Sequence, residues 1–162
     1  MSDELVIGPG DVRGDDEAAL IGELDRELVM RYRGTPGEAF SEVDPTHPEH
    51  FNEPEGLFLV ARLDGKAIAC GGLRRVDGST AEIKRMYVKP ENRKTGLARK
   101  ILAALERRAE QQGYERIILK SGTAQPDACA LYESSGYERI EPYGVWKDSP
   151  ESICYSKKLT AT

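Results

Sequence analysis

The sequence has few of the residues that build metal sites and disulfide frameworks. Its 162 residues include three cysteines, Cys70, Cys129 and Cys154, and two histidines, His47 and His50. The cysteines are odd in number, far apart in the chain and never paired as Cys-x-x-Cys. We therefore expect reduced thiols and no zinc or other metal site.

Long apolar runs and a large excess of one charge are also missing. No segment approaches the roughly 20 consecutive apolar residues of a membrane span, and the acidic N-terminus has no apolar stretch typical of a signal peptide. The 23 basic and 28 acidic side chains leave a net charge of −5, which disfavours a histone-like nucleic-acid binder and an acidic disordered tail. We expect a single soluble, cytoplasmic domain over residues 1–162, without nucleic-acid or membrane partners.

Apolar periodicity and turn dipeptides divide the chain into strands and helices. Asp64-Gly65 and Asp77-Gly78 separate three apolar runs, which predicts an antiparallel meander. The predicted elements are strands at 5–7, 57–61, 66–73, 80–88, 117–119, 137–140 and 153–159, and helices over 15–31, from 97 to Gly113 and from 126 to Gly136. Residues 34–56 are predicted to be a loop or a region of short helices. This mixture is typical of an α+β fold around one central sheet.

The stretch Arg93-Lys94-Thr95-Gly96-Leu97-Ala98 lies between a predicted strand and an amphipathic helix. The first N–H groups of a helix lack intrahelical acceptors, and the helix dipole adds positive potential there. Gly96 allows a ligand to approach the backbone closely, and Ala98 adds little bulk, so the stretch suits a pyrophosphate. An ordinary strand–helix connection is the alternative for a motif this short.

Three blocks in order strengthen this interpretation. They are Ala81–Val88, the Arg-x-x-Gly-x-Ala pattern at 93–98, and Ala130-Leu131-Tyr132-Glu133-Ser134-Ser135-Gly136-Tyr137. Together they resemble the GNAT superfamily of N-acetyltransferases over about residues 57–159. The resemblance implies a three-layer α+β fold, in which a mixed, mostly antiparallel sheet lies between helices and its fourth and fifth strands splay apart. It also implies acetyl-CoA as cosubstrate.

The resemblance assigns cofactor roles to two segments. The segment Met86-Tyr87-Val88 is expected along the pantetheine arm, with Met86 and Val88 pairing through backbone groups. The amides from Arg93 to Ala98, including Lys94, Thr95 and Leu97, are expected to hold the pyrophosphate, and Lys94, Arg99 or Lys100 is expected at the 3′-phosphate. Between Lys84 and Arg108 there are nine basic and two acidic residues, which would attract a polyanion. A solvated helix face is the alternative for part of this charge.

Tyr132 is the candidate general acid, because the matching tyrosine of the resembling family lies near the CoA sulfur. Its helical spacing predicts that Ala128 and Leu131 face the core instead. The alternative for Tyr132 is a buried structural tyrosine. Cys129 is interpreted as a small core residue rather than as an acetyl-cysteine, because no histidine is evidently placed to activate it.

Glu82 is the candidate general base, since amine attack on a thioester needs a proton acceptor. Some protein-lysine-acetylating members of the superfamily carry a basic glutamate at the matching position. Strict alternation places Glu82, Lys84, Met86 and Val88 on one face unless a bulge intervenes. A surface glutamate, with ordered water as the base, is the alternative.

We therefore expect transfer of an acetyl group from acetyl-CoA to a primary amine by direct attack in a ternary complex. The segment 34–61 has six acids and no lysine or arginine, which favours a small, cationic amine acceptor unless this is only a solvated loop. Two further hypotheses are a non-catalytic acyl-CoA-binding sensor module and a protein-lysine acetyltransferase. The sequence leaves the oligomeric state open, a homodimer included.

Overall fold

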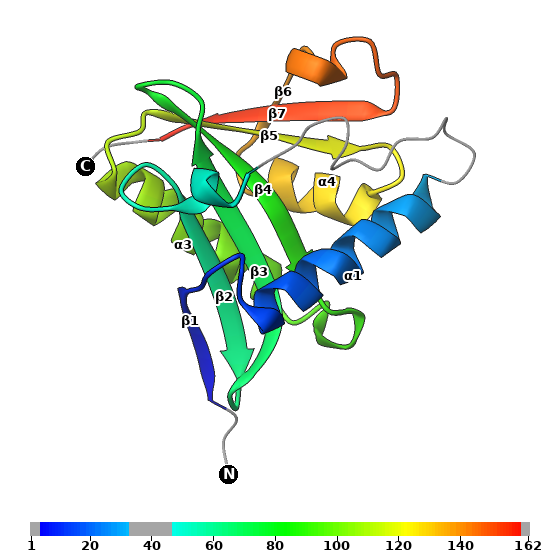
Figure 1. Ribbon diagram of the computed structural model, residues 1–162. Coiled ribbons are helices and arrows are strands. Elements are labelled where there is room, and N and C mark those ends of the chain that lie inside the picture. Colours follow the sequence, from blue (N-terminus) through cyan, green and yellow to red (C-terminus); the bar gives the residue numbers. More distant parts are fainter. Residues whose placement is uncertain (1–3, 33–46, 160–162) are drawn as a thin grey trace.

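The computed structural model describes residues 4–32 and 47–159 of the chain, and these residues share one seven-stranded sheet (Figure 1). The strand order is β1-β2-β3-β4-β5-β7-β6. The strands are β1 (Leu5–Pro9), β2 (Leu57–Leu63), β3 (Lys66–Arg75), β4 (Thr80–Val88), β5 (Arg116–Gly122), β6 (Glu138–Ile140) and β7 (Ser152–Lys158). The helices are α1 (Asp15–Arg31), α3 (Leu97–Gln111) and α4 (Pro126–Ser134), with short 3₁₀ turns η1 (Pro48–Phe51), η2 (Pro90–Asn92) and η3 (Gly144–Trp146).

The sheet is mostly antiparallel, and its one parallel pair within the described residues joins β4 to β5. The meander β2-β3-β4 is confirmed, and its first turn has the positive φ angles of Asp64 (50°) and Gly65 (85°) that a tight hairpin requires. The strand β7 lies between β5 and β6 instead of following β6 outward. The predicted α+β, GNAT-like architecture is confirmed, although β1 runs two residues further than the predicted strand at 5–7.

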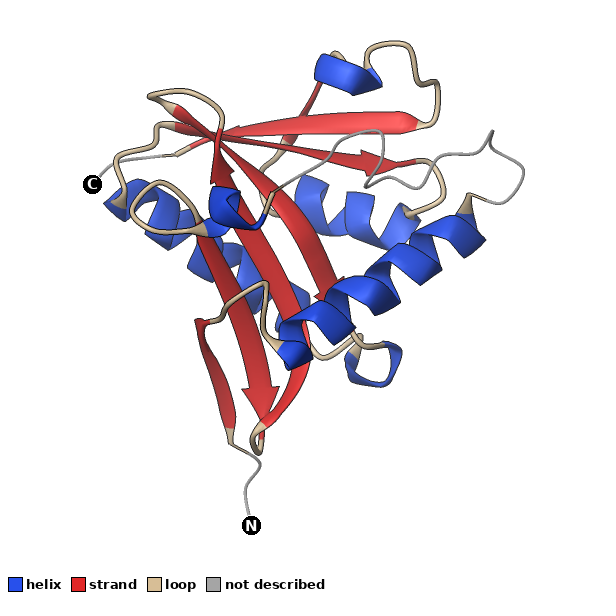
Figure 2. Ribbon diagram, in the orientation of Figure 1, coloured by secondary structure: helices blue, strands red, loops and turns tan. Residues whose placement is uncertain are grey.

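The helices cover the two faces of the sheet and complete three layers (Figure 2). Leu20 and Leu24 of α1, one helical turn apart, are buried with Phe58 and Tyr87 on one face. On the opposite face, the buried residues of α3 form one core with residues of β4, β5 and α4. The apolar stripe of α3 consists of Leu97, Ile101, Leu102, Leu105 and Ala109.

A bulge interrupts β4 and changes which side chains share a face. The pairing of β4 with β3 shifts between Cys70 and Gly72, and Arg85 opposite this shift has a φ angle of 62°. Beyond the bulge, Met86 and Val88 join the core under α3. Glu82 and Lys84 therefore do not share a face with Met86 and Val88. The bulge that the sequence left open is present, and its extra residue reverses the alternation.

Among the helices in the described part of the chain, none is long and apolar enough to span a membrane.

Candidate active site

The central feature of the site is the divergence of β4 and β5. Their parallel pairing runs only from Thr80 opposite Arg116 to Glu82 opposite Ile118, and the two strands then separate (Figure 1). Two neighbouring cavities lie at this separation, a larger one of about 400 Å³ and a smaller one of about 100 Å³. Leu24, Met86, Gln125 and Tyr132 line both. The splayed strands that the sequence predicts thus form the walls of a two-part site.

The larger cavity begins at the N-terminus of α3, where backbone donors are available. Lys94 and Gly96 have φ angles of 64° and 84°, and Gly96 caps the helix without a side chain. The backbone N–H groups from Lys94 to Arg99 have no hydrogen-bond acceptor within the described residues. A run of free amides at the positive end of a helix suits an anionic ligand of pyrophosphate size.

Most of the predicted cofactor residues line this larger cavity. They are Met86, Tyr87, Val88, Arg93, Lys94, Gly96, Leu97, Ala98 and Arg99. Thr95 is the exception, and its hydroxyl donates a hydrogen bond to the Asn92 carbonyl at 2.8 Å. Lys100 lies against a separate groove beside β1, so Lys94 and Arg99 remain the candidates for a third phosphate.

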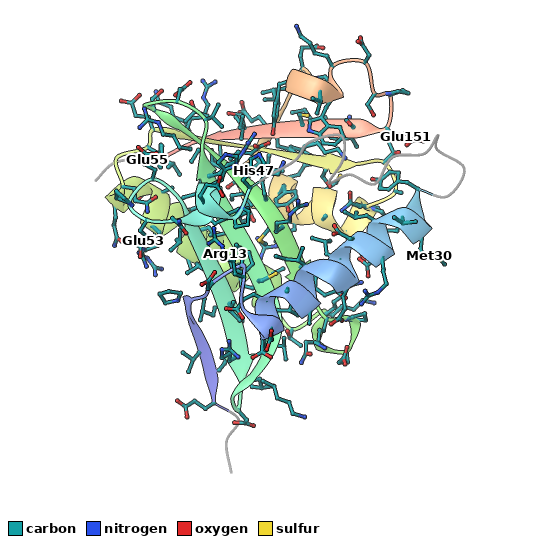
Figure 3. All side chains as sticks on the ribbon, in the orientation of Figure 1. Arg13, Met30, His47, Glu53, Glu55 and Glu151 are labelled. Atoms are coloured by element: carbon teal, nitrogen blue, oxygen red, sulfur yellow. The ribbon has the colours of Figure 1, made fainter. Side chains whose placement is uncertain are left out.

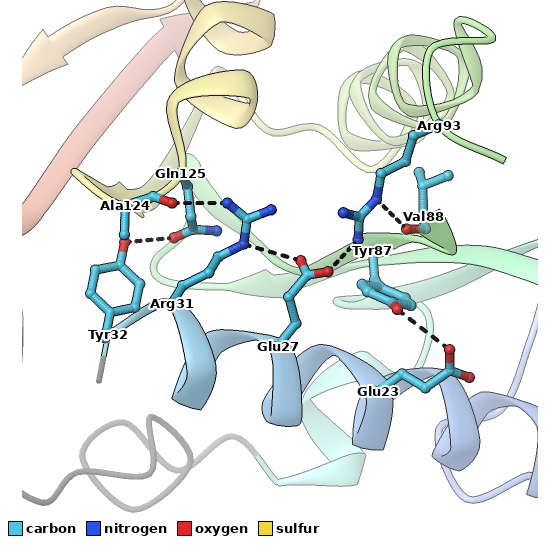
Figure 4. A network of polar contacts seen from close by, with 9 residues as sticks. All are labelled: Glu23, Glu27, Arg31, Tyr32, Tyr87, Val88, Arg93, Ala124 and Gln125. Carbon is cyan, nitrogen blue, oxygen red and sulfur yellow. Dashed lines mark hydrogen bonds and ion pairs between the residues drawn. The ribbon is translucent and has the colours of Figure 1, made fainter. Parts of the chain in front are cut away.

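The Arg93 side chain takes part in a polar network instead of lying free in the cavity (Figure 4). Its guanidinium donates to the Val88 carbonyl at 2.9 Å and to the Glu27 carboxylate at 2.6 Å. Glu27 also lies 3.4 Å from Arg31, which donates to the carbonyl of Ala124. The network ties α1 to the segment that follows β4 and to the segment between β5 and α4.

Tyr132 on α4 lies where the two cavities meet. Its side chain is 6% exposed, and burial raises the pKa of its hydroxyl well above the usual value of a tyrosine. The ring packs against Tyr137 and Tyr155 with centroid distances of 5.8 and 5.9 Å. Among the described residues, the Tyr132 hydroxyl has no hydrogen-bond partner. A phenol of this kind keeps its proton and can donate it into either cavity.

The neighbours of Tyr132 on α4 contact the core, as the sequence predicts, and they also contribute to the site. Ala128 and Leu131 are half-buried and line the larger cavity, whereas Cys129 and Tyr132 form the buried face. Ala128 and Leu131 also pack against the main core, so each of them contacts the core and the larger cavity. Cys129 lines neither cavity, and its thiol lies 3.6 Å from the Gly122 carbonyl, as expected for a core cysteine.

Glu82 is buried at the wall of the smaller cavity, with only 2% of its surface exposed. One carboxylate oxygen accepts a hydrogen bond from Arg74 Nε at 2.7 Å, and the other accepts one from the Tyr143 hydroxyl at 2.6 Å. The alternative interpretation of Glu82 as a surface residue is therefore wrong. The two contacts fix the carboxylate at the cavity wall, where it can accept a proton from a bound molecule or from water.

The acids of the segment 34–61 that the structure describes do not line the smaller cavity. Glu49, Glu53 and Glu55 pair with Arg13, Arg108 and Arg75 at the surface. Met30 lies near the C-terminal end of α1. Figure 3 shows Glu53 and Glu55 on the opposite side of the molecule from Met30. Glu38, Glu42 and Asp44 lie outside the described residues. The cationic-acceptor hypothesis thus has no support in the described part of this segment.

The two histidines stabilise the turn η1. The backbone N–H of His47 donates to His50 Nδ1 at 3.1 Å, and their rings are in edge contact. Within the described residues, no cluster of three or more histidine, cysteine, aspartate or glutamate side chains is arranged to hold a metal ion.

Sequence reasoning missed several residues of the smaller cavity. Lys120, Ser121, Gln125 and Trp146 line it, and Tyr143 contacts Glu82. One sequence feature could have indicated that this segment contributes to the site. Tyr143 and Trp146, the only tryptophan of the chain, lie close together in the polar segment between β6 and β7. Tyrosine and tryptophan combine a large apolar ring with a polar group that usually finds a hydrogen-bond partner when buried.

Comparisons with known proteins agree with this arrangement. The model of the Acetyltransferase (GNAT) family matches residues 24–137. An IAA acetyltransferase from Azospirillum brasilense is 32% identical over 146 residues, which cover 90% of this chain and 92% of the relative. The crystal structure of a Klebsiella pneumoniae protein described as an acyl-CoA N-acyltransferase has a TM-score of 0.78 at 26% identity, covering 96% of this chain and 98% of that chain. The PaiA N-acetyltransferase from Thermoplasma acidophilum, in complex with coenzyme A, shares the fold, with a TM-score of 0.73 at 20% identity over 96% of this chain and 99% of that chain.

The fold, the splayed strands and the free amides at the N-terminus of α3, together with these relatives, define an acyl-CoA-dependent N-acetyltransferase. The chain belongs to the GNAT acetyltransferase family, so the resemblance seen in its three motifs is confirmed.

Proposed function

We propose that the protein transfers an acetyl group from acetyl-CoA to a primary amine by direct attack within a ternary complex. The observation that supports this most is the position of Tyr132, which lines both cavities and keeps its proton. A leaving thiolate in the larger cavity and an attacking amine in the smaller one would both lie next to this hydroxyl.

The larger cavity fits acetyl-CoA through its backbone. The free amides from Lys94 to Arg99 would bind the pyrophosphate, and the β4 edge at Met86–Val88 has no β5 partner and would pair with the pantetheine arm. Bound there, acetyl-CoA supplies the thioester. A backbone N–H of the same edge would polarise the thioester carbonyl as negative charge develops on its oxygen.

The chemical step then needs two proton transfers. The amine nitrogen attacks the carbonyl carbon, a C–N bond forms and the C–S bond breaks. Tyr132 would give its proton to the departing sulfur, and Glu82 would take the proton that the amine loses, directly or through water. Proton exchange with solvent restores both groups.

Two hypotheses compete with this proposal. A sensor module would bind acetyl-CoA without turnover, and a protein-lysine acetyltransferase would need an open groove for a peptide. The smaller cavity, at about 100 Å³, suits a small amine better than a peptide segment. The free, buried state of Cys70, Cys129 and Cys154 fits the cytoplasmic location expected from the sequence.

Initial rates measured while acetyl-CoA and an amine are both varied test the mechanism. Direct attack predicts intersecting double-reciprocal lines. Parallel lines, together with an acetylated cysteine detected by mass spectrometry, would instead require a covalent intermediate and would overturn the proposal.

A further inference from the structure

The smaller cavity has a basic lining in an acidic protein. Lys84, Arg85 and Lys120 line it, and Glu82 is the only acid of this lining among the described residues. Since Glu82 is paired with Arg74 at 2.7 Å, much of its charge is compensated. Three of the four charged side chains of this lining are therefore basic, although the whole chain carries −5.

Arg85 is the least constrained of these cations. It occupies the bulge of β4 with a φ angle of 62°, a left-handed conformation that is unfavourable for a residue with a side chain. Such strain is found preferentially at functional sites, and bulges often redirect a side chain there. Within the described part of the chain, the Arg85 guanidinium makes no hydrogen bond or ion pair, so its donors are available to a ligand.

Lys120 reaches the same cavity from β5. Its ammonium group lies 4.2 Å from the ring centroid of Trp146 and 5.8 Å from that of Tyr32. Aromatic faces hold a cation in place without removing its charge. Gln125 adds an amide whose oxygen accepts a hydrogen bond from Tyr32, which leaves its N–H groups as donors.

We propose that the acceptor carries a carboxylate beside its amine, as an amino acid does, and that Arg85 and Lys120 bind this carboxylate. The inference rests on the proposed acetyl transfer and names its substrate class. A guanidinium offers the paired donors that a carboxylate accepts, and the nearby ammonium adds a second charge. A basic surrounding also disfavours the ammonium form of the acceptor and so favours the neutral amine that must attack.

Matched pairs of acceptors test the proposal. Glycine is compared with methylamine, and phenylalanine with phenethylamine, because each pair differs only by the carboxylate. We expect kcat/KM to be about 10- to 100-fold higher for the amino acids, the range expected for a hydrogen bond to a charged group. Arg85→Gln should raise the KM for the amino acids about tenfold or more and leave the KM for the simple amines and for acetyl-CoA unchanged.

The control variant is Lys66→Gln, which removes a positive charge from the exposed β2–β3 turn and should change no KM. Lys120→Met provides a second test that leaves the strained backbone at Arg85 unchanged. It should also raise the KM for the amino acids. Equal kcat/KM within each acceptor pair, with no effect of Arg85→Gln, would overturn the carboxylate site and leave acetyl transfer intact.

Binding separates this inference from the proposed function. Calorimetry on the CoA-saturated protein compares N-acetylphenylalanine with N-phenethylacetamide, so it needs no turnover. Selective binding of the carboxylate form, lost in Arg85→Gln, would support the site even if no amine were acetylated and the proposed function failed. Binding of both compounds with equal affinity would overturn it.

Discussion

At the scale of single residues, the position of Tyr132 explains why this tyrosine rather than its neighbours suits acid catalysis. Three tyrosine rings pack together, but the Tyr137 hydroxyl donates to Glu106 and that of Tyr155 donates to Glu133. Both are therefore engaged in structural contacts. Only the Tyr132 hydroxyl of this cluster is left to face the two cavities.

Replacing Tyr132 by phenylalanine removes that hydroxyl and keeps the ring. We expect kcat to fall roughly 10- to 1,000-fold, as for loss of a general acid, while the Kd for acetyl-CoA stays within about threefold. Steady-state kinetics and calorimetry measure the two effects. Tyr137→Phe is the matched control and should keep wild-type kcat, because its hydroxyl contacts Glu106. Equal kcat values for wild type and Tyr132→Phe would show that Tyr132 is only structural.

Glu82→Gln tests the proposed base without changing the size of the side chain. We expect kcat/KM for the amine to fall about 100-fold or more at neutral pH. The difference in kcat/KM between wild type and Glu82→Gln should become smaller as the pH approaches the pKa of the amine. At such pH more of the amine is already neutral, so the reaction depends less on a base of the protein. Glu106→Gln is a close control, because Glu106 also accepts hydrogen bonds from a tyrosine and a cation, Tyr137 and Lys157. A loss of kcat/KM that is the same in both variants would point to a structural effect.

At the scale of elements, the proposed pyrophosphate binding at the N-terminus of α3 depends on the backbone, through its free amides. A glutamate at position 96 would be strained at a φ angle of 84° and would place negative charge beside the free amides. We expect Gly96→Glu to raise the Kd for acetyl-CoA at least tenfold, as measured by calorimetry.

Gly113→Glu separates this charge effect from strain. Gly113 follows the other end of α3, has a φ angle of 93° and, like Gly96, has open space where a Cβ would lie. Both variants should lower the Tm by similar amounts, but only the one at Gly96 should weaken acetyl-CoA binding. Unchanged affinity in Gly96→Glu would rule out this loop as the pyrophosphate site.

The elements that the sequence predicts well are those with a strong local signal. Asp64-Gly65 and the apolar stripe of α3 depend on neighbours in the chain, so the meander and the helix are predictable. The bulge at Arg85 arises from pairing with β3, and it reversed the expected faces of Met86 and Val88. Likewise, Arg93 begins the Arg-x-x-Gly-x-Ala pattern at 93–98, but its side chain contacts Glu27, 66 residues away. Contacts of this range leave no periodic pattern in one sequence.

At the scale of the whole molecule, the buried tyrosines make stability depend on alkaline pH. Burial raises the pKa of Tyr132, and burial together with the Glu106 carboxylate raises that of Tyr137. In the unfolded chain both groups ionise near pH 10. Above that pH the unfolded state releases protons that the folded state keeps, so the free energy of unfolding decreases as the pH rises.

We therefore expect the Tm to be insensitive to these tyrosines below about pH 9 and to fall steadily above about pH 10. Tyr137→Phe should lower the slope of this fall, because one titrating group is removed. Circular dichroism melts between pH 8 and pH 11, at fixed ionic strength, measure the effect. Identical slopes for wild type and Tyr137→Phe would contradict the assignment.

The central claim is that an amine in the smaller cavity takes the acetyl group from acetyl-CoA in the larger one. The release of the CoA thiol measures this reaction most directly. The protein is incubated with acetyl-CoA and a panel of amines, free CoA is followed with a thiol reagent, and mass spectrometry quantifies the N-acetylated product. The account predicts amine-dependent CoA release that equals the amount of product and falls in Tyr132→Phe. Tight binding of acetyl-CoA without CoA release for any amine would contradict it and would favour a sensor module.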